Sequence, residues 1–273
     1  MIQNLSQIFL LEDQGSIQDY LRILIDKDPI NKTISMSQPG LIELVLADLN
    51  LLNGAKPKDT PSVGILYPDW DGIPRQESWN SRSVIVKLNY IAQNTRLDIS
   101  FAVHQCAHYS SSPTALQELA VKCIGQYLSA TKDKGLVMHP THNFKLDMFV
   151  DANFAGMWHW EYSELCECAL SRTSYIITYC GCPIHWASKL QSKIALSTTE
   201  SEYTALSMAS RELIPLCQLI VELHKHGLFS TPLGKPFSVT HTSTLEASTI
   251  YEDNASCVVL AHSEGTKVRT KHI

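Results

Sequence analysis

One long amphipathic helix, predicted over residues 197–227, constrains this chain more than any other feature. Ser197 followed by Glu200 forms a capping box, in which the hydroxyl accepts from a free backbone N–H and the glutamate reaches back to the cap. Gly227 follows a basic stretch, which is typical of a helix end. An apolar stripe at helical spacing predicts one buried face, made of Leu206, Ala209, Leu213, Leu216 and Ile220.

Glu202 lies on this apolar stripe, whereas Glu200 points roughly to the other side of the helix. A carboxylate on a buried face costs free energy unless a charged or polar group meets it. Asp151 ends an alternating, strand-like run, and Asp253 follows a short apolar run. Because ligands gather at the carboxyl ends of strands in open α/β sheets, these three carboxylates predict a site for hard divalent cations.

Four blocks of sequence resemble, in their order and spacing, the ribonuclease H domain of copia-type retrotransposon polyproteins. The blocks are FVDANFAG, RTSYIITYCGCPIHWASKLQSKIALSTTESEYTALSMASRE, YEDN and VRTKHI. The resemblance implies that Asp151, Glu202 and Asp253 are catalytic, metal-binding carboxylates, that Mg2+ or Mn2+ is the cofactor, and that the substrate is an RNA–DNA hybrid. A fourth family carboxylate is expected just after the last block, where this chain ends at Ile273.

The chemistry that the resemblance implies is metal-assisted hydrolysis. Two Mg2+ ions about 4 Å apart activate water and stabilise the leaving oxygen in such sites. Asp151 and Asp253 would be direct ligands, and Glu202 would help to bind one ion and to position the RNA strand. Taken singly, Asp151 is typical of a turn at a strand end and Asp253 of an N-cap. The family spacing of all three favours the metal site.

The chain divides at residues 139–143, which are typical of a linker. Residues 144–273 predict three strands, a long helix, a strand and a helix, an α/β (α+β) order that suits a ribonuclease H-like mixed sheet with packed helices. Residues 1–140 predict a helix or strand pair and a helix, then a connecting segment over 53–80 and a helical block over 81–138. They resemble the late palm and thumb/connection of copia-type reverse transcriptase, but contain no Tyr-x-Asp-Asp motif.

Three stretches depart from the family pattern or extend it. Pro215 stands inside the predicted long helix, where it removes a backbone hydrogen bond and costs about 3 kcal/mol or kinks the helix. The stretch MWHWEYSELCECALS is less polar than is usual in the family at this place. Residues 230–248 form a long polar loop, which predicts a surface insertion.

Composition limits the partners and the compartment. A formal net charge of -5 argues against tight, autonomous nucleic-acid binding, because such binders are usually basic on at least one face. The absence of a signal peptide and of an apolar run of roughly 20 residues predicts a cytoplasmic or nuclear protein that does not enter a membrane. Two Cys-x-Cys pairs, at 166/168 and 180/182, predict reduced thiols, with a hairpin zinc site as the alternative.

Two functional classes remain open at this point. The first is an endoribonuclease that acts on RNA in RNA–DNA hybrids, as a fragment of a Pol polyprotein whose other parts are its partners. The second is a non-catalytic remnant or a domesticated module that binds nucleic acid or protein. Because the polymerase aspartates and the fourth carboxylate lie outside this sequence, we expect weak or no activity of this chain by itself.

Overall fold

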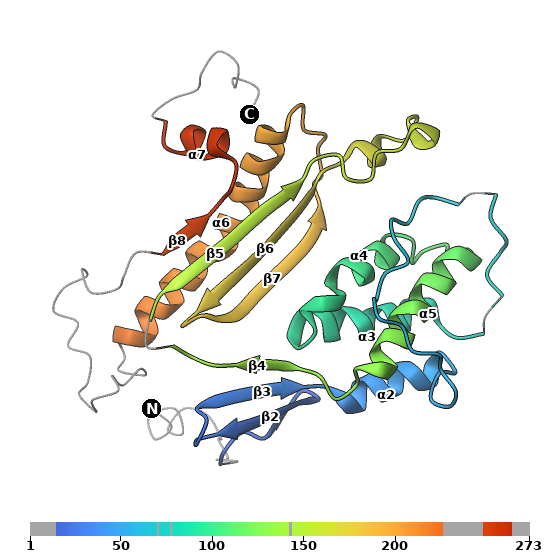
Figure 1. Ribbon diagram of the computed structural model, residues 1–273, viewed down its shortest axis with the longest axis horizontal. Helices are drawn as coiled ribbons and strands as arrows, with labels where there is room; N and C mark the ends of the chain where they lie inside the picture. The colour runs from blue at the N-terminus through green and yellow to red at the C-terminus, as the bar shows by residue number, and fades with distance from the viewer. Residues whose placement is uncertain (1–14, 70, 77, 142–143, 226–247, 264–273) are drawn as a thin grey trace, which may run out of the picture.

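The computed structural model of the protein describes residues 15–69, 71–76, 78–141, 144–225 and 248–263. Within these ranges the chain forms two four-stranded sheets, each accompanied by helices (Figure 1). The N-terminal sheet has the order β1-β2-β3-β4 and is antiparallel throughout. The second sheet has the order β7-β6-β5-β8, in which β8 runs parallel to β5. The protein is therefore mixed α/β (α+β), while the ribonuclease H-like details stay a prediction.

The first sheet and its helices come from the chain before residue 139. The elements are β1 (Asp19–Tyr20), β2 (Ile23–Asp28), β3 (Thr33–Ser37), α2 (Pro39–Asp48), α3 (Ser81–Asn94), η1 (Leu97–Ile99), α4 (Ser100–His108), α5 (Ala115–Ala130) and β4 (Leu136–Met138). Of the two alternatives for the start of the chain, strands followed by a helix are found, with three strands, β1 to β3, in place of the predicted pair. The helical block is confirmed as far as Ala130, but its last residues are a correction: 136–138 form a strand, because they pair with the free edge of β3.

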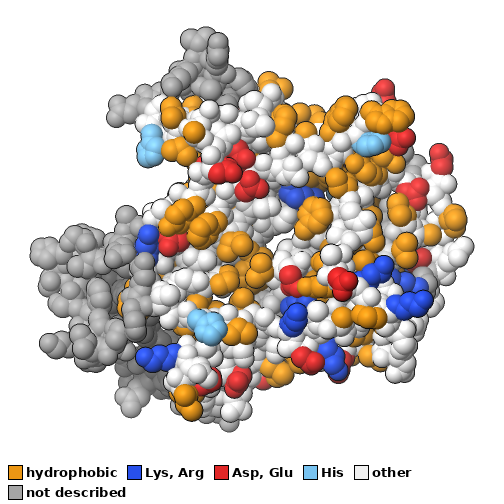
Figure 2. Space-filling view, in the orientation of Figure 1, with side chains coloured by type: hydrophobic (Ala, Val, Ile, Leu, Met, Phe, Trp, Pro, Cys, Tyr) orange, Lys and Arg blue, Asp and Glu red, His pale blue; other side chains and the backbone are white. Residues whose placement is uncertain are grey.

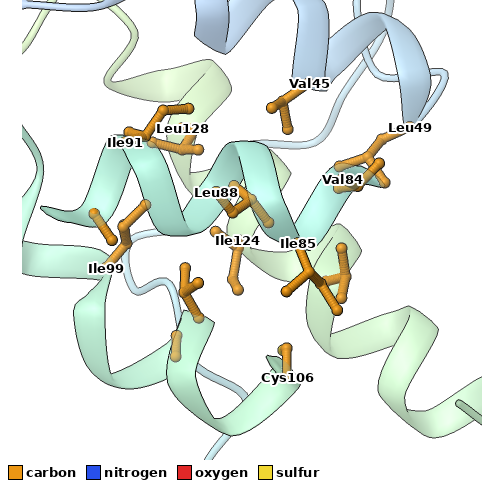
Figure 3. Packing of buried hydrophobic residues seen from close by; sticks show 14 of the residues in the cluster. Val45, Leu49, Val84, Ile85, Leu88, Ile91, Ile99, Cys106, Ile124 and Leu128 are labelled. Atoms are coloured by element: carbon orange, nitrogen blue, oxygen red, sulfur yellow. The ribbon is translucent and has the colours of Figure 1, made fainter. Parts of the chain in front are cut away.

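Helices α2 to α5 share one apolar core. Figure 3 shows side chains from these helices pointing toward one another, with Leu88 and Ile124 near the middle. Both side chains are fully buried. Arg96 closes one side of this core, since its guanidinium pairs with Asp98 at 2.7 Å and donates to the carbonyl of Thr131 at 2.8 Å.

The chain after residue 143 follows the predicted order of strands and helices. Its elements are β5 (Leu146–Asn153), η2 (Trp160–Tyr162), η3 (Cys166–Ala169), β6 (Arg172–Tyr179), β7 (Cys182–Leu190), α6 (Thr198–Lys225), β8 (Thr249–Tyr251) and α7 (Ala255–Ala261). The predicted insertion at 230–248 lies outside the described residues, apart from Ser248. In β5, alternate side chains from Leu146 to Ala152 are buried, and they pack with Ala205, Ala209 and Leu213 of α6 in a second apolar core.

Helix α6 starts where the sequence predicts. The Ser197 hydroxyl accepts from the Glu200 N–H at 3.2 Å, and the Glu200 carboxylate accepts from the N–H of Leu196 at 2.7 Å. Glutamate therefore reaches one residue further back than a standard capping box. The helix continues through Pro215 to Lys225, so the proline does not end it. The predicted end at Gly227 lies outside the described residues.

Polar contacts join the two parts of the chain. The indole N–H of Trp186 in β7 donates to the carbonyl of Ala92 in α3 at 2.8 Å, and the Trp186 side chain is buried. Arg172 in β6 hydrogen-bonds His104 in α4 at 3.1 Å. These contacts position the helices of the first part beside the second sheet (Figure 1). The division into modules 1–140 and 144–273 stays a prediction.

Candidate metal centre

Three carboxylates from separate elements meet beside the end of β8. Asp151 lies in β5, Glu202 near the start of α6, and Asp253 between β8 and α7. One carboxylate oxygen from each lies within 4.8 Å of those of the other two. Figure 2 shows acidic side chains gathered in this place on the molecular surface. The structure thus brings together the three residues that the sequence singled out, while their catalytic and metal-binding roles stay predictions.

The local structure excludes the simpler interpretations of both aspartates, namely a turn residue for Asp151 and an N-cap for Asp253. Strand β5 continues past Asp151, which pairs with Ser174 of β6, so the aspartate is not a turn residue. The N-cap of α7 is Asn254, whose side chain accepts from the Cys257 N–H at 2.9 Å. Both aspartates are exposed, and their carboxylates face the same cluster.

Glu202 is the buried member of the cluster, with 7% of its surface exposed. Burial, followed by the negative charges of Glu252 and Asp151, raises the pKa of Glu202 to about 7, and the N–H of Ala152 opposes this rise. The Oε2 atom of Glu202 is buried without a hydrogen-bond partner in the described structure. A buried carboxylate oxygen is costly unless a proton or cation meets it, so this donor set fits a hard divalent cation.

Glu252 is a fourth carboxylate near the cluster that the sequence reasoning missed. Its Oε1 accepts from the Asn254 N–H at 3.0 Å, while Oε2 is buried without a hydrogen-bond partner in the described structure. Burial raises the pKa of Glu252, and the charges of Asp253 and Asp151 act in the same direction. The sequence signal for Glu252 was its place next to Asp253, directly after a strand. Neighbouring side chains in extended backbone point to opposite faces, so the two carboxylates can reach a site from two sides.

Glu200 lies outside the cluster, as its helical phase predicted. Its carboxylate stays at the start of α6, where it also lines a separate pocket of about 340 Å3 together with Lys193 and Arg211. A larger groove of about 520 Å3 opens beside Asp151, between the second sheet and the η1–α4 region. Its wall includes Phe149 and Asp151, so this groove reaches one of the three carboxylates of the cluster.

The cysteines follow the reduced-thiol prediction. All eight are free thiols, and Cys180 and Cys182 flank the turn of the β6–β7 hairpin. The turn requires positive φ at Cys180 and Gly181, with values of 52° and 76°. Among the described residues, no set of three metal-ligating side chains includes a cysteine, so the zinc alternative has no support there. None of the described helices combines the length and apolar character needed to cross a membrane.

The comparisons with known proteins point to retrotransposons. No family model matches the chain, and no solved structure matches it at a significant level. The chain is 30% identical, over 277 aligned residues, to the retrovirus-related Pol polyprotein from transposon TNT 1-94 of Nicotiana tabacum. It is 28% identical, over 273 residues, to the retrovirus-related Pol polyprotein from transposon RE1 of Arabidopsis thaliana. The chain belongs to the copia-type retrotransposon Pol polyproteins.

The alignments cover only a small part of each Pol polyprotein. The two alignments cover 99% and 100% of this chain, but 19% and 17% of the polyproteins. The chain therefore spans about a fifth of the length of these Pol relatives. A further relative, an uncharacterized mitochondrial protein of Arabidopsis thaliana, is 28% identical over 214 residues, which is 78% of this chain and 84% of that protein.

Proposed function

We propose that this chain supplies a Pol polyprotein with a ribonuclease H-type cation site that hydrolyses the RNA strand of RNA–DNA hybrids. The observation that carries the proposal is the meeting of Asp151, Glu202 and Asp253 within 4.8 Å. The buried Oε2 of Glu202, which lacks a hydrogen-bond partner in the described structure, supports it. Mg2+ and Mn2+ prefer oxygen ligands of this kind.

The three carboxylates would have different roles, because they differ in their exposure to solvent. Bound divalent cations would supply an activated water and stabilisation of the leaving oxygen. Asp151 and Asp253, both exposed, offer their oxygens where a nucleic-acid strand can approach. Glu202 accepts from the Ala152 N–H and keeps Oε2 without a hydrogen-bond partner in the described structure, so this oxygen would be available to a cation. The groove beside Asp151 gives the strand its path to these carboxylates.

A second candidate is a non-catalytic module that binds nucleic acid or protein. Two observations favour it. The net charge of -5 offers little general attraction for a polyanion. The cation cluster in the described residues has three carboxylates, and a small ligand set holds a second Mg2+ weakly because this ion gives up its water reluctantly.

The deciding experiment measures cation binding and cleavage on the same preparation. The purified chain is titrated with Mn2+ and incubated with a labelled RNA–DNA hybrid, next to Asp151→Asn and a control variant, Asp26→Asn. Asp26 is an exposed carboxylate on β2, in the other sheet. Cleavage that needs Mn2+, disappears in Asp151→Asn and survives in the control supports the nuclease. Asp151-dependent Mn2+ binding without cleavage supports the non-catalytic module, and a chain that binds no Mn2+ contradicts the cation site itself.

A further inference from the structure

We propose that Glu252 is a fourth carboxylate of this cation site: a positioning residue that faces Glu202 and whose negative charge raises the affinity of the cluster for a divalent cation. The inference rests on the proposed function, because it assigns one more residue to the same site. The family resemblance assigns metal-binding roles to Asp151, Glu202 and Asp253, and none to Glu252.

The register of the second sheet places Glu252 opposite the start of α6. Strands β8 and β5 are parallel, and Phe149 is paired with Tyr251. Their rings stack on one face of the sheet, with centroids 4.6 Å apart. Continuing this register by one residue sets Glu252 beside Val150, whose side chain is buried in the core shared with α6. Because side chains alternate along extended backbone, Glu252 points toward α6.

The residue after Glu252 is Asp253, and its position separates the two aspartates from Glu252. If the alternation continues past the end of β8 at Tyr251, Asp253 lies on the face opposite to Glu252, beside Asp151. Both aspartates belong to the cluster within 4.8 Å. Glu202 comes from α6, and one of its carboxylate oxygens lies within 4.8 Å of those of both aspartates. In agreement with this placement, the charge of Glu252 affects Glu202 more strongly than the charge of any other residue.

Both glutamates carry a buried oxygen whose partner is absent from the described residues. These atoms are Oε2 of Glu202 and Oε2 of Glu252, and Glu202 is more than nine-tenths buried. The other oxygen of Glu252 is held by the Asn254 N–H, which fixes the carboxylate in place. The buried thiol of Cys257 also lies near both glutamates, and it carries no positive charge. Two neighbouring carboxylates that each bury an oxygen without a hydrogen-bond partner in the described structure are stabilised by a nearby cation.

Glu252 acts through charge and through Glu202, since it lies outside the group of three that share the 4.8 Å cluster. A unit charge acting on a divalent ion across a partly solvated site changes its affinity by about three- to tenfold. We therefore expect Glu252→Gln to weaken Mn2+ binding by about this factor. Glu252→Asp keeps the charge and is expected to keep most of the affinity.

The experiment titrates the full chain with Mn2+ and measures free Mn2+ by electron paramagnetic resonance. The variants are Glu252→Gln, Glu252→Asp and a control, Glu200→Gln, which removes a nearby carboxylate outside the cluster. Urea unfolding in the presence of a chelator gives a second reading. If the role of Glu252 is electrostatic, Glu252→Gln is at least as stable as the wild type without cation, because a like charge near Glu202 has been removed.

Each outcome decides the matter. Weaker Mn2+ binding in Glu252→Gln, with near wild-type binding in Glu252→Asp and Glu200→Gln, supports the inference. Binding in Glu252→Gln within twofold of the wild type overturns it, as does a loss of stability without cation, which would show a structural role. Mn2+ binding that depends on Asp151 but not on Glu252 overturns this inference alone. A wild-type chain that binds no Mn2+ overturns the proposed function and this inference together.

Discussion

Replacement of Glu202 by glutamine is expected to stabilise the cation-free protein at neutral and alkaline pH. The glutamine side chain has nearly the same shape and its carbonyl can still accept from the Ala152 N–H, as the carboxylate does now. It carries no charge, so it removes the repulsion from Asp151, Asp253 and Glu252. Among the described residues, the titratable groups that act on the Glu202 carboxylate include these three carboxylates and the Cys257 thiol.

The expected magnitude follows from the pKa of Glu202, which burial and neighbouring charges raise from 4.5 to about 7. One pKa unit corresponds to about 1.4 kcal/mol, so the whole shift would amount to about 3 kcal/mol. Because Asp151 and Asp253 are exposed and solvent screens their charges, we expect about 1–2 kcal/mol. Since the folded pKa is raised, the wild type loses this stability as pH rises from about 4.5 through 7, whereas the variant does not.

Urea unfolding with a chelator, at pH 5 and at pH 8, measures the effect. The free energy of unfolding of Glu202→Gln should exceed that of the wild type by about 1–2 kcal/mol at pH 8, and by little at pH 5. Glu200→Gln, the same substitution two residues earlier in the helix, should show no gain at pH 8. Saturating Mn2+ should reverse the order, because about 2.7 kcal/mol is gained at one hundred times the Kd by a protein that binds the ion. A constant difference between wild type and Glu202→Gln across this pH range would refute the reasoning.

Three further substitutions test the fold that holds the site. Pro215→Ala restores a backbone hydrogen bond within α6 and is expected to raise the free energy of unfolding by up to about 3 kcal/mol in urea titrations; a decrease would show that the proline is accommodated without cost. Ser197→Ala removes the acceptor of the Glu200 N–H and is expected to lower stability by about 1 kcal/mol, with the loss seen in thermal unfolding; an unchanged midpoint would contradict the role of the cap. Trp186→Phe removes the indole donor of the Ala92 carbonyl, which then keeps the longer hydrogen bond from the Ser100 hydroxyl at 3.4 Å. The variant is expected to lower stability by about 1–2 kcal/mol in urea; an equal stability would mean that the Ser100 hydroxyl or water replaces the indole there.

Local patterns were sufficient for the helices and for the order of the strands. Helix α6 begins at Thr198, directly after the predicted cap, because the capping chemistry and the apolar stripe act within a few residues of each other. The same local periodicity separated Glu202 from Glu200, since a helix turns by about 100° per residue and directs these two carboxylates to different sides. The sequence by itself also indicated the strand end that carries Asp151, although β5 runs two residues further.

Pairings between distant segments needed the tertiary structure. Residues 136–138 form β4 only because β3, about one hundred residues earlier, offers a free edge to them. The position of Glu252 depends on the parallel register of β8 on β5, and a shift of one residue would turn its carboxylate to the other face. The raised pKa of Glu202 likewise depends on burial and on charges brought in from β5 and from the segment after β8. The sequence determined which carboxylates could meet, while the register between distant strands decided which of them do, because strand pairing is set by contacts that no local pattern contains.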